Sequence, residues 1–154
     1  MDIDRIYARV WVNKNHWISI CIKFALRTVE VFDCGGNNNR RHVESFACVV
    51  PRILKEVHAK VYGKVPLLTQ YKIVPTKVPP NHNRFACDCG VYELKYIECK
   101  MLQISMDWLN DENIKEARMR IAMDLWEASR DPILIQRMKN YAPPFVSSDM
   151  IEID

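Results

Sequence analysis

Three side chains capable of nucleophilic and acid–base chemistry lie far apart in the 154-residue sequence: the imidazole of His16, the carboxylate of Asp33 and the thiol of Cys89. A carboxylate that bonds to an imidazole holds the ring in one tautomer and stabilises its cationic form. A thiol beside such a pair can give up its proton and attack a carbonyl carbon. These residue types therefore predict thiol-based catalysis if the fold brings them together.

A predicted β-hairpin brings the imidazole and the carboxylate together. Apolar, often β-branched side chains alternate with other residues in three segments, residues 6–12, 17–24 and 28–32. A turn centred after Ala25 places Ile22 opposite Val29, which matches the apolar faces of the two strands. In the same register His16 and Asp33 are diagonal neighbours with Cα atoms about 7–8 Å apart, so their side chains can meet.

The predicted nucleophile, Cys89, lies where a proline-rich segment, residues 63–88, turns into a helix. The helix is indicated by an apolar stripe with steps of three and four residues, formed by Val91, Leu94, Ile97, Met101 and Ile104. Unpaired N–H groups in the first turn of a helix favour the thiolate form of a cysteine placed there. The following residue, Gly90, allows a substrate backbone to approach closely.

The remaining segments complete a predicted fold of the α+β class, in which helices pack around a small antiparallel sheet. Two further helices are expected over residues 42–62 and 111–129, and a short strand near residues 70–74. Pro51 lies inside the first of these helices and predicts either a kink or two abutting helices. The asparagine-rich segment 37–41 is interpreted as a solvated loop.

The composition excludes several classes of protein. Hydrophobic residues make up 49% and charged residues 27% of the sequence, which suits one globular domain. The net charge of +3 is too small to indicate nucleic-acid binding. No apolar run approaches the roughly 18 residues of a membrane span, and the N-terminus lacks the apolar core of a secretory signal. We therefore expect a protein that binds neither membrane nor nucleic acid.

The six cysteines are predicted to be free thiols in a reducing compartment. Cys21, Cys48 and Cys99 are interpreted as core residues, and Cys34 as a small packing residue.

Cys87, Cys89 and His82 offer an alternative interpretation as metal ligands. Zinc sites usually combine a cysteine pair separated by two to four intervening residues with a second pair elsewhere, and the sequence has no such second pair. We therefore predict no metal site and no cofactor.

The residues with candidate chemistry also resemble a known family. His16-Trp17, the 17-residue step to Asp33 and the segment DCGVY at residues 88–92 resemble the ubiquitin-like-protein-specific cysteine proteases, which are SUMO-deconjugating or sentrin-specific enzymes. The segment GVYELKYIE at residues 90–98 most resembles the plant members of this family, many of which are carried by transposons. The resemblance runs from about residue 6 to residue 101 and implies a papain-like version of the α+β fold.

The resemblance implies a cysteine-type peptidase that cleaves after the Gly-Gly ending of a SUMO-like protein. By position, Cys89 corresponds to the nucleophile, His16 to the residue that accepts and returns the proton, and Asp33 to the residue that orients the imidazole. Trp17 corresponds to a residue that roofs the narrow tunnel for Gly-Gly. The implied partners are a SUMO-like protein and its conjugates, the implied location is the nucleus or cytoplasm, and a monomer is expected.

The sequence departs from the family at the residue that helps to form the oxyanion hole. The family has a Gln six residues before the nucleophile, and this chain has Asn83 there. Because the segment looks slightly longer than usual, Asn81 is the alternative candidate. An Asn carries the same amide donor on a shorter arm, and a misplaced donor can cost roughly 100- to 1000-fold in rate.

A second departure lies before His16, where only 15 residues precede the imidazole and the family normally has a further helical region. We therefore expect a partial catalytic domain over residues 1–131, followed by a C-terminal extension over residues 132–154 that is less well ordered. Two alternatives stay open. One is a catalytically impaired remnant that at most binds a ubiquitin-like protein. The other is a transposon-encoded accessory protein that acts near DNA.

Overall fold

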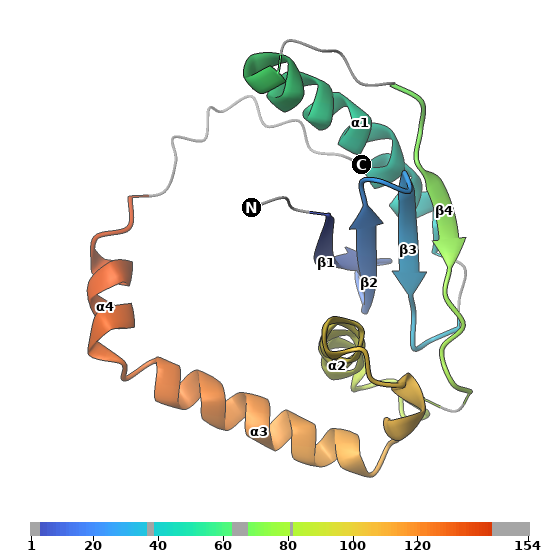
Figure 1. The fold of residues 1–154 in the computed structure, drawn as a ribbon. Coiled ribbons are helices and arrows are strands. Elements are labelled where there is room, and N and C mark those ends of the chain that lie inside the picture. The colour runs from blue at the N-terminus through green and yellow to red at the C-terminus, as the bar shows by residue number, and fades with distance from the viewer. Residues whose placement is uncertain (1–3, 37–38, 63–67, 81, 143–154) are drawn as a thin grey trace. The chain divides into compact units, whose positions relative to one another are not determined.

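The computed structural model describes residues 4–36, 39–62, 68–80 and 82–142. The elements in chain order are β1 (Arg5–Val12), β2 (His16–Lys23), β3 (Thr28–Phe32), α1 (Arg40–Tyr62), β4 (Lys72–Pro75), α2 (Cys89–Leu102), the 3-10 turn η1 (Met106–Trp108), α3 (Asn113–Ala128) and α4 (Pro132–Lys139). These elements confirm the predicted α+β class (Figure 1).

The chain divides into two compact units, residues 1–115 and residues 116–154. The first unit contains the sheet, α1, α2 and the start of α3, and the second contains the rest of α3 and α4. No helix in the described part of the chain combines the length and the apolarity that a membrane span requires.

The sheet has four strands in the order β1-β2-β3-β4. The first three strands are antiparallel, and the predicted register is confirmed because Ile22 pairs with Val29 and Ile20 with Val31. β4 joins the sheet parallel to β3, because the chain passes through α1 between these two strands and so returns in the same direction.

The central strand β2 is buried on both faces, whereas the alternation in the sequence predicts half-buried strands. Its even-numbered residues, such as Ile18 and Ile20, belong to a core that includes the α1 residues Val43 and Ala47. Its odd-numbered residue Cys21 belongs to a second core that includes α2. Because successive side chains of a strand point to opposite faces, α1 and α2 cover the two faces of the sheet.

A single helix, α1, contains Pro51, so the prediction of two abutting helices is wrong. Proline has no backbone N–H and leaves the carbonyl four residues earlier without its helical donor. That carbonyl belongs to Ala47, and it accepts the N–H of Tyr71 at 3.1 Å. Pro51 therefore leaves the Ala47 carbonyl available to Tyr71, the residue that precedes β4, and this bond ties α1 to the strand.

Cys48, predicted as a core residue, is exposed because it lies off the buried face of α1.

The buried face of α2 differs from the predicted apolar stripe. The buried residues are Tyr92, Glu93, Tyr96 and Cys99, whereas Met101 and Ile104 are exposed. The reason is a stack of rings, in which the imidazole of His82 lies 4.9 Å from the ring centroid of Tyr92 and 5.9 Å from that of Tyr96. Aromatic rings at helical spacing therefore set the inward face of α2, rather than the aliphatic residues.

Candidate active site

His16 and Asp33 meet at the edge of the sheet where β2 begins and β3 ends. Nε2 of His16 lies 2.7 Å from Oδ1 of Asp33, and both side chains are largely buried. Antiparallel pairing places the first residue of β2 beside the residue that follows β3. The contact predicted from the alternation of apolar residues is therefore present in the structure.

Two further donors fix the carboxylate of Asp33. The N–H of Gly35 bonds to Oδ1 at 2.8 Å, and the side-chain amide of Asn39 donates to Oδ2 at 2.7 Å. Asn39 is buried, although the sequence predicts a solvated loop there. Sequence reasoning missed this residue because its signal is only an Asn directly before a helix. Three hydrogen bonds hold the carboxylate in the orientation that faces His16.

The bond to Asp33 decides which nitrogen of the imidazole is available for chemistry. A neutral imidazole that donates its Nε2 proton to a carboxylate keeps a lone pair on Nδ1. Nδ1 of His16 is therefore the ring atom that can accept a proton. This is the arrangement expected of an imidazole that serves a neighbouring thiol.

Cys89 is the first residue of α2 and is partly buried. A Cβ atom added to Gly90 would lie 3.5 Å from Cδ1 of Trp17, so the first turn of α2 packs against the residue next to His16. The ring of Trp17 also contacts Trp11, with 4.9 Å between centroids, and Arg9, whose guanidinium lies 5.1 Å from the ring. These contacts place the start of α2 at the same end of the sheet as His16.

A second thiol, that of Cys34, lies beside the pair. Donor atoms of His16, Asp33 and Cys34 all lie within 4.8 Å of one another, a set that could hold a metal ion although the sequence predicts none. Burial raises the pKa of the Cys34 thiol well above its usual range, and the charges of Glu93, Asp33 and Cys89 raise it further. Cys34 therefore stays protonated, so it is a poor nucleophile at neutral pH.

Asn83 lies next to the start of α2. Its Oδ1 accepts the N–H of Asp88 at 2.8 Å, and its Nδ2 donates to Sγ of Cys34 at 3.5 Å. Its own N–H donates to Oδ1 of Asp111 at 2.9 Å. The side-chain amide of Asn83 is thus held against the N–H of Asp88, the residue that precedes Cys89, and beside the sulfur of Cys34. The alternative candidate Asn81 lies outside the described residues.

Asp111 fixes the loop that carries Asn83. Its carboxylate accepts the hydroxyl of Tyr92 at 2.6 Å and Nε of Arg84 at 2.9 Å. The bond from Tyr92 and the bonds from the loop lower the pKa of Asp111 to about 2. One ionised carboxylate therefore ties the loop before α2 to Tyr92 in the first turn of that helix.

Both ring nitrogens of His82 take part in hydrogen bonds within the fold. Nδ1 lies 2.7 Å from the hydroxyl of Tyr96, and Nε2 lies 2.7 Å from the carbonyl oxygen of Leu109. Burial lowers the pKa of this imidazole, so the ring is neutral at physiological pH. Because both ring nitrogens are engaged, the structure does not support His82 as a metal ligand beside Cys87 and Cys89.

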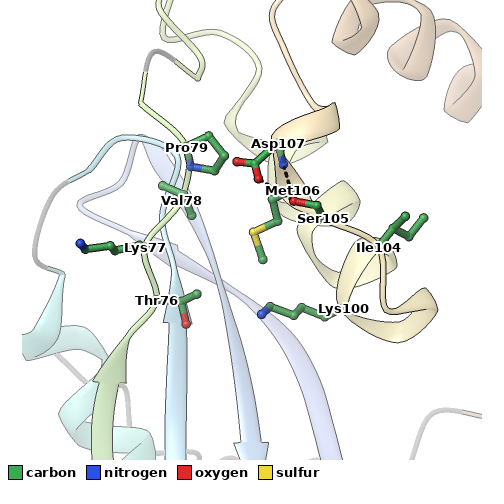
Figure 2. A pocket seen from close by; sticks show the side chains of 9 residues that line it. All are labelled: Thr76, Lys77, Val78, Pro79, Lys100, Ile104, Ser105, Met106 and Asp107. Carbon is green, nitrogen blue, oxygen red and sulfur yellow. Dashed lines mark hydrogen bonds between the residues drawn. The ribbon is translucent and has the colours of Figure 1, made fainter.

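Two pockets lie in the first unit, and one of them includes Asp33. One, of about 380 Å³, is lined by Asp33 and Asn39 together with Arg40 and residues of β3 and β4. The other, of about 330 Å³, lies between the segment after β4 and the end of α2 (Figure 2). Figure 2 shows Lys77 and Lys100 at this second pocket, and none of the candidate site residues lines it.

Comparison with known proteins adds an independent finding. The model of a family described as the Ulp1 protease family, C-terminal catalytic domain, matches residues 1–133 of the chain. The comparison with curated proteins gives no match.

Solved structures of Ulp1 are similar to part of the chain. The C-terminal Ulp1 protease domain in complex with Smt3, the yeast ortholog of SUMO, is 18% identical over 75% of this chain and 49% of that chain, with a TM-score of 0.48. The SUMO protease Ulp1 with its catalytic cysteine oxidised to a sulfonic acid is 18% identical over 75% of this chain and 50% of that chain, with a TM-score of 0.48. The chain therefore spans about half the length of these solved structures.

Proposed function

The chain belongs to the Ulp1 protease family, whose catalytic-domain model matches residues 1–133, and on that premise we propose that it is a cysteine-type peptidase that uses Cys89, His16 and Asp33 together. The family predicted from the sequence is thereby confirmed, while the plant, transposon-associated type stays a prediction. The single observation that carries the proposal is the 2.7 Å bond between His16 and Asp33 beside the helix that begins at Cys89.

The proposed reaction is acyl transfer through a thioester. Nδ1 of His16 takes the thiol proton of Cys89, and the sulfur attacks the carbonyl carbon of the scissile bond. The tetrahedral intermediate collapses when His16 gives its proton to the leaving amine, which leaves an acyl group on the sulfur. A water molecule then loses a proton to His16 and attacks the acyl carbon. The C–S bond breaks, the carboxylic acid leaves, and His16 returns its proton to the sulfur, which restores the thiol. Asp33 holds the ring and stabilises its cationic form throughout.

The packing of Trp17 supports a substrate that ends in Gly-Gly. The indole ring lies against Gly90, directly beside Cys89, so it limits the space next to the nucleophile. Glycine has no Cβ atom, so a Gly-Gly ending suits a passage that an indole ring narrows. We therefore assign a SUMO-like protein and its conjugates as the substrate class.

We assign the oxyanion donor to Asn83, with Asn81, which lies outside the described residues, as the alternative. Its side chain is held at the start of α2 by its bond to the N–H of Asp88. From there its amide group and the N–H of Cys89 could donate to the same oxygen of a tetrahedral intermediate, which is the usual composition of an oxyanion hole.

The experiment that tests the proposal uses a SUMO protein whose C-terminal glycine carries a thiol-reactive group. The wild-type chain should form a covalent adduct that is lost in Cys89→Ser and retained in Cys87→Ser, an exposed thiol two residues away. Cys34→Ser should also retain the adduct, because the Cys34 thiol is buried and protonated.

Two outcomes would overturn this proposal. An adduct that depends on Cys34 instead of Cys89 would show that Cys34, and not Cys89, is the nucleophile. Saturable binding of SUMO without any adduct would favour the alternative function, a module that binds a ubiquitin-like protein without cleaving its conjugates.

A further inference from the structure

Glu93 is a buried carboxyl group that the proposed mechanism does not use. It lies on α2 four residues after Cys89, which places both on the same side of the helix about one turn apart. Its side chain has no exposed surface. Burying a carboxyl group costs free energy unless nearby groups compensate, so its position requires a structural reason.

The contacts of Glu93 lead directly to the proposed catalytic pair. Its Oε1 accepts the backbone N–H of Cys34 at 3.1 Å, and Cys34 directly follows Asp33 in the chain. Its Oε2 has no hydrogen-bond partner among the described residues. The backbone carbonyl of Glu93 accepts the hydroxyl of Ser19, a buried residue of β2, at 3.0 Å. Glu93 therefore contacts β2, which carries His16, and the segment directly after β3, which carries Asp33.

We propose that Glu93 is a positioning residue that sets the distance between the Cys89 thiol and the His16–Asp33 pair. The inference rests on the proposed function. Its bond to the Cys34 N–H ties the end of β3 to α2, and α2 begins with the nucleophile. One helix therefore carries both the thiol and the acceptor that fixes the residue next to Asp33. Without that acceptor, α2 and the end of β3 lose the direct hydrogen bond between them.

The protonation state of Glu93 suits this role. Burial raises its pKa to about 8, although the bond from the Cys34 N–H lowers it, and the charge of Asp33 raises it. At neutral pH the carboxyl is therefore mostly uncharged and still accepts through Oε1. The titratable groups around it are Asp33, Cys34 and Tyr96, with His16 beyond Asp33. A neutral acceptor at this place does not repel the carboxylate or a thiolate.

Two variants distinguish the role of the acceptor oxygen of Glu93 from the role of its charge. Glu93→Gln keeps an acceptor oxygen, and Glu93→Leu removes it at similar volume. We expect Glu93→Leu to lower kcat at least tenfold at pH 7 with KM within twofold, and Glu93→Gln to keep at least half of kcat. Glu98→Gln, an exposed carboxyl on the same helix, serves as the matched control and should equal wild type. The rates are expressed per active site, titrated with the SUMO probe.

The inference would be overturned if Glu93→Leu kept kcat within twofold of wild type. It would also be overturned if Glu93→Gln lost as much as Glu93→Leu, because the acceptor would then not be the cause.

A measurement on the wild-type chain tests the same contact without any variant or turnover. In an NMR titration, the amide signal of Cys34 should shift with a midpoint near pH 8 as Glu93 ionises, and the ring signals of His16 should show the same step. A Cys34 amide that is insensitive to pH between 7 and 9 would contradict the inference. This readout does not require proteolysis, so failure of the proposed function and failure of the positioning role are distinguishable.

Discussion

Gly35 lies against both members of the His16–Asp33 pair. A Cβ atom at this position would lie 3.2 Å from Oδ1 of Asp33 and 3.3 Å from Cε1 and Nε2 of His16. Such distances are shorter than ordinary van der Waals contact, so the imidazole or the carboxylate would have to move. The absence of a side chain at Gly35 is therefore a condition for the observed geometry of the pair.

We expect Gly35→Ala to lower kcat roughly tenfold, because small displacements of positioned groups cost rate steeply. Gly36→Ala is the matched control, since no atom lies within 4 Å of its added Cβ and its φ of +65° costs only stability, about 1 kcal/mol. Rates per titrated site and thermal unfolding measure the two effects separately. Equal rates in wild type and Gly35→Ala would show that the pair tolerates the added methyl group.

The raised pKa of Glu93 also predicts how stability depends on pH. The folded chain holds the proton up to about pH 8, whereas the unfolded chain releases it near the usual value of 4.5. The unfolded state therefore binds fewer protons between these values, and the free energy of unfolding falls as pH rises through this window, by up to about 1.4 kcal/mol per pH unit. Glu93→Gln should flatten this decline in denaturant titrations at pH 5, 6, 7 and 8. A decline of the same slope in the variant would show that other groups cause it.

At the scale of elements, the loop before α2 determines where the proposed oxyanion donor lies. Asn83 has a φ of 54°, a left-handed conformation that Asn and Asp tolerate better than most residues. Asp111 and Asp88 hold it through the bonds described above, and Tyr92 connects Asp111 to α2. The loop and the helix therefore act as one unit that presents the amide group next to Cys89.

Asn83→Asp keeps the left-handed preference and the acceptor for the Asp88 N–H, but it removes the donating NH₂ group. We expect kcat to fall roughly 100-fold with KM nearly unchanged, because the donor acts mainly in the transition state. Asn81→Asp, at the alternative position, should stay near wild type in the same steady-state assay. The opposite result, with loss only in Asn81→Asp, would assign the donor to the other asparagine.

The hairpin and its register could be predicted from the sequence, because only one pairing of β2 and β3 matches the apolar faces of Ile22 and Val29. That register alone brings His16 to Asp33. The parallel pairing of β4 could not be predicted, because it depends on where α1 delivers the chain.

The sequence patterns did not indicate Asn39 and Glu93 as residues of the site, for a similar reason. Each is a common surface residue type, and its burial depends on partners far away in the sequence. For Glu93, the available signal was its four-residue spacing from Cys89, which places a carboxyl group on the nucleophile's side of the helix.

At the scale of the whole molecule, the family match over residues 1–133 covers the first compact unit and continues into the second. The predicted boundary at residue 131, and a less ordered extension after it, stay predictions. The chain spans about half the length of the solved Ulp1 structures, so its activity on a SUMO-like protein is a proposal to be measured on this chain itself.

In the proposed mechanism, one residue of β2, the residue that follows β3 and the first residue of α2 form a common reaction centre. The reaction centre is tested most simply by the rate of alkylation of Cys89 at neutral pH, resolved by mass spectrometry of the peptides, in wild type and in His16→Ala. The exposed thiol of Cys87 is an internal reference in the same peptide region. We expect Cys89 to react faster than Cys87 in wild type, and His16→Ala to abolish this difference. Equal alkylation rates of Cys89 in the two proteins would show that His16 does not activate the thiol.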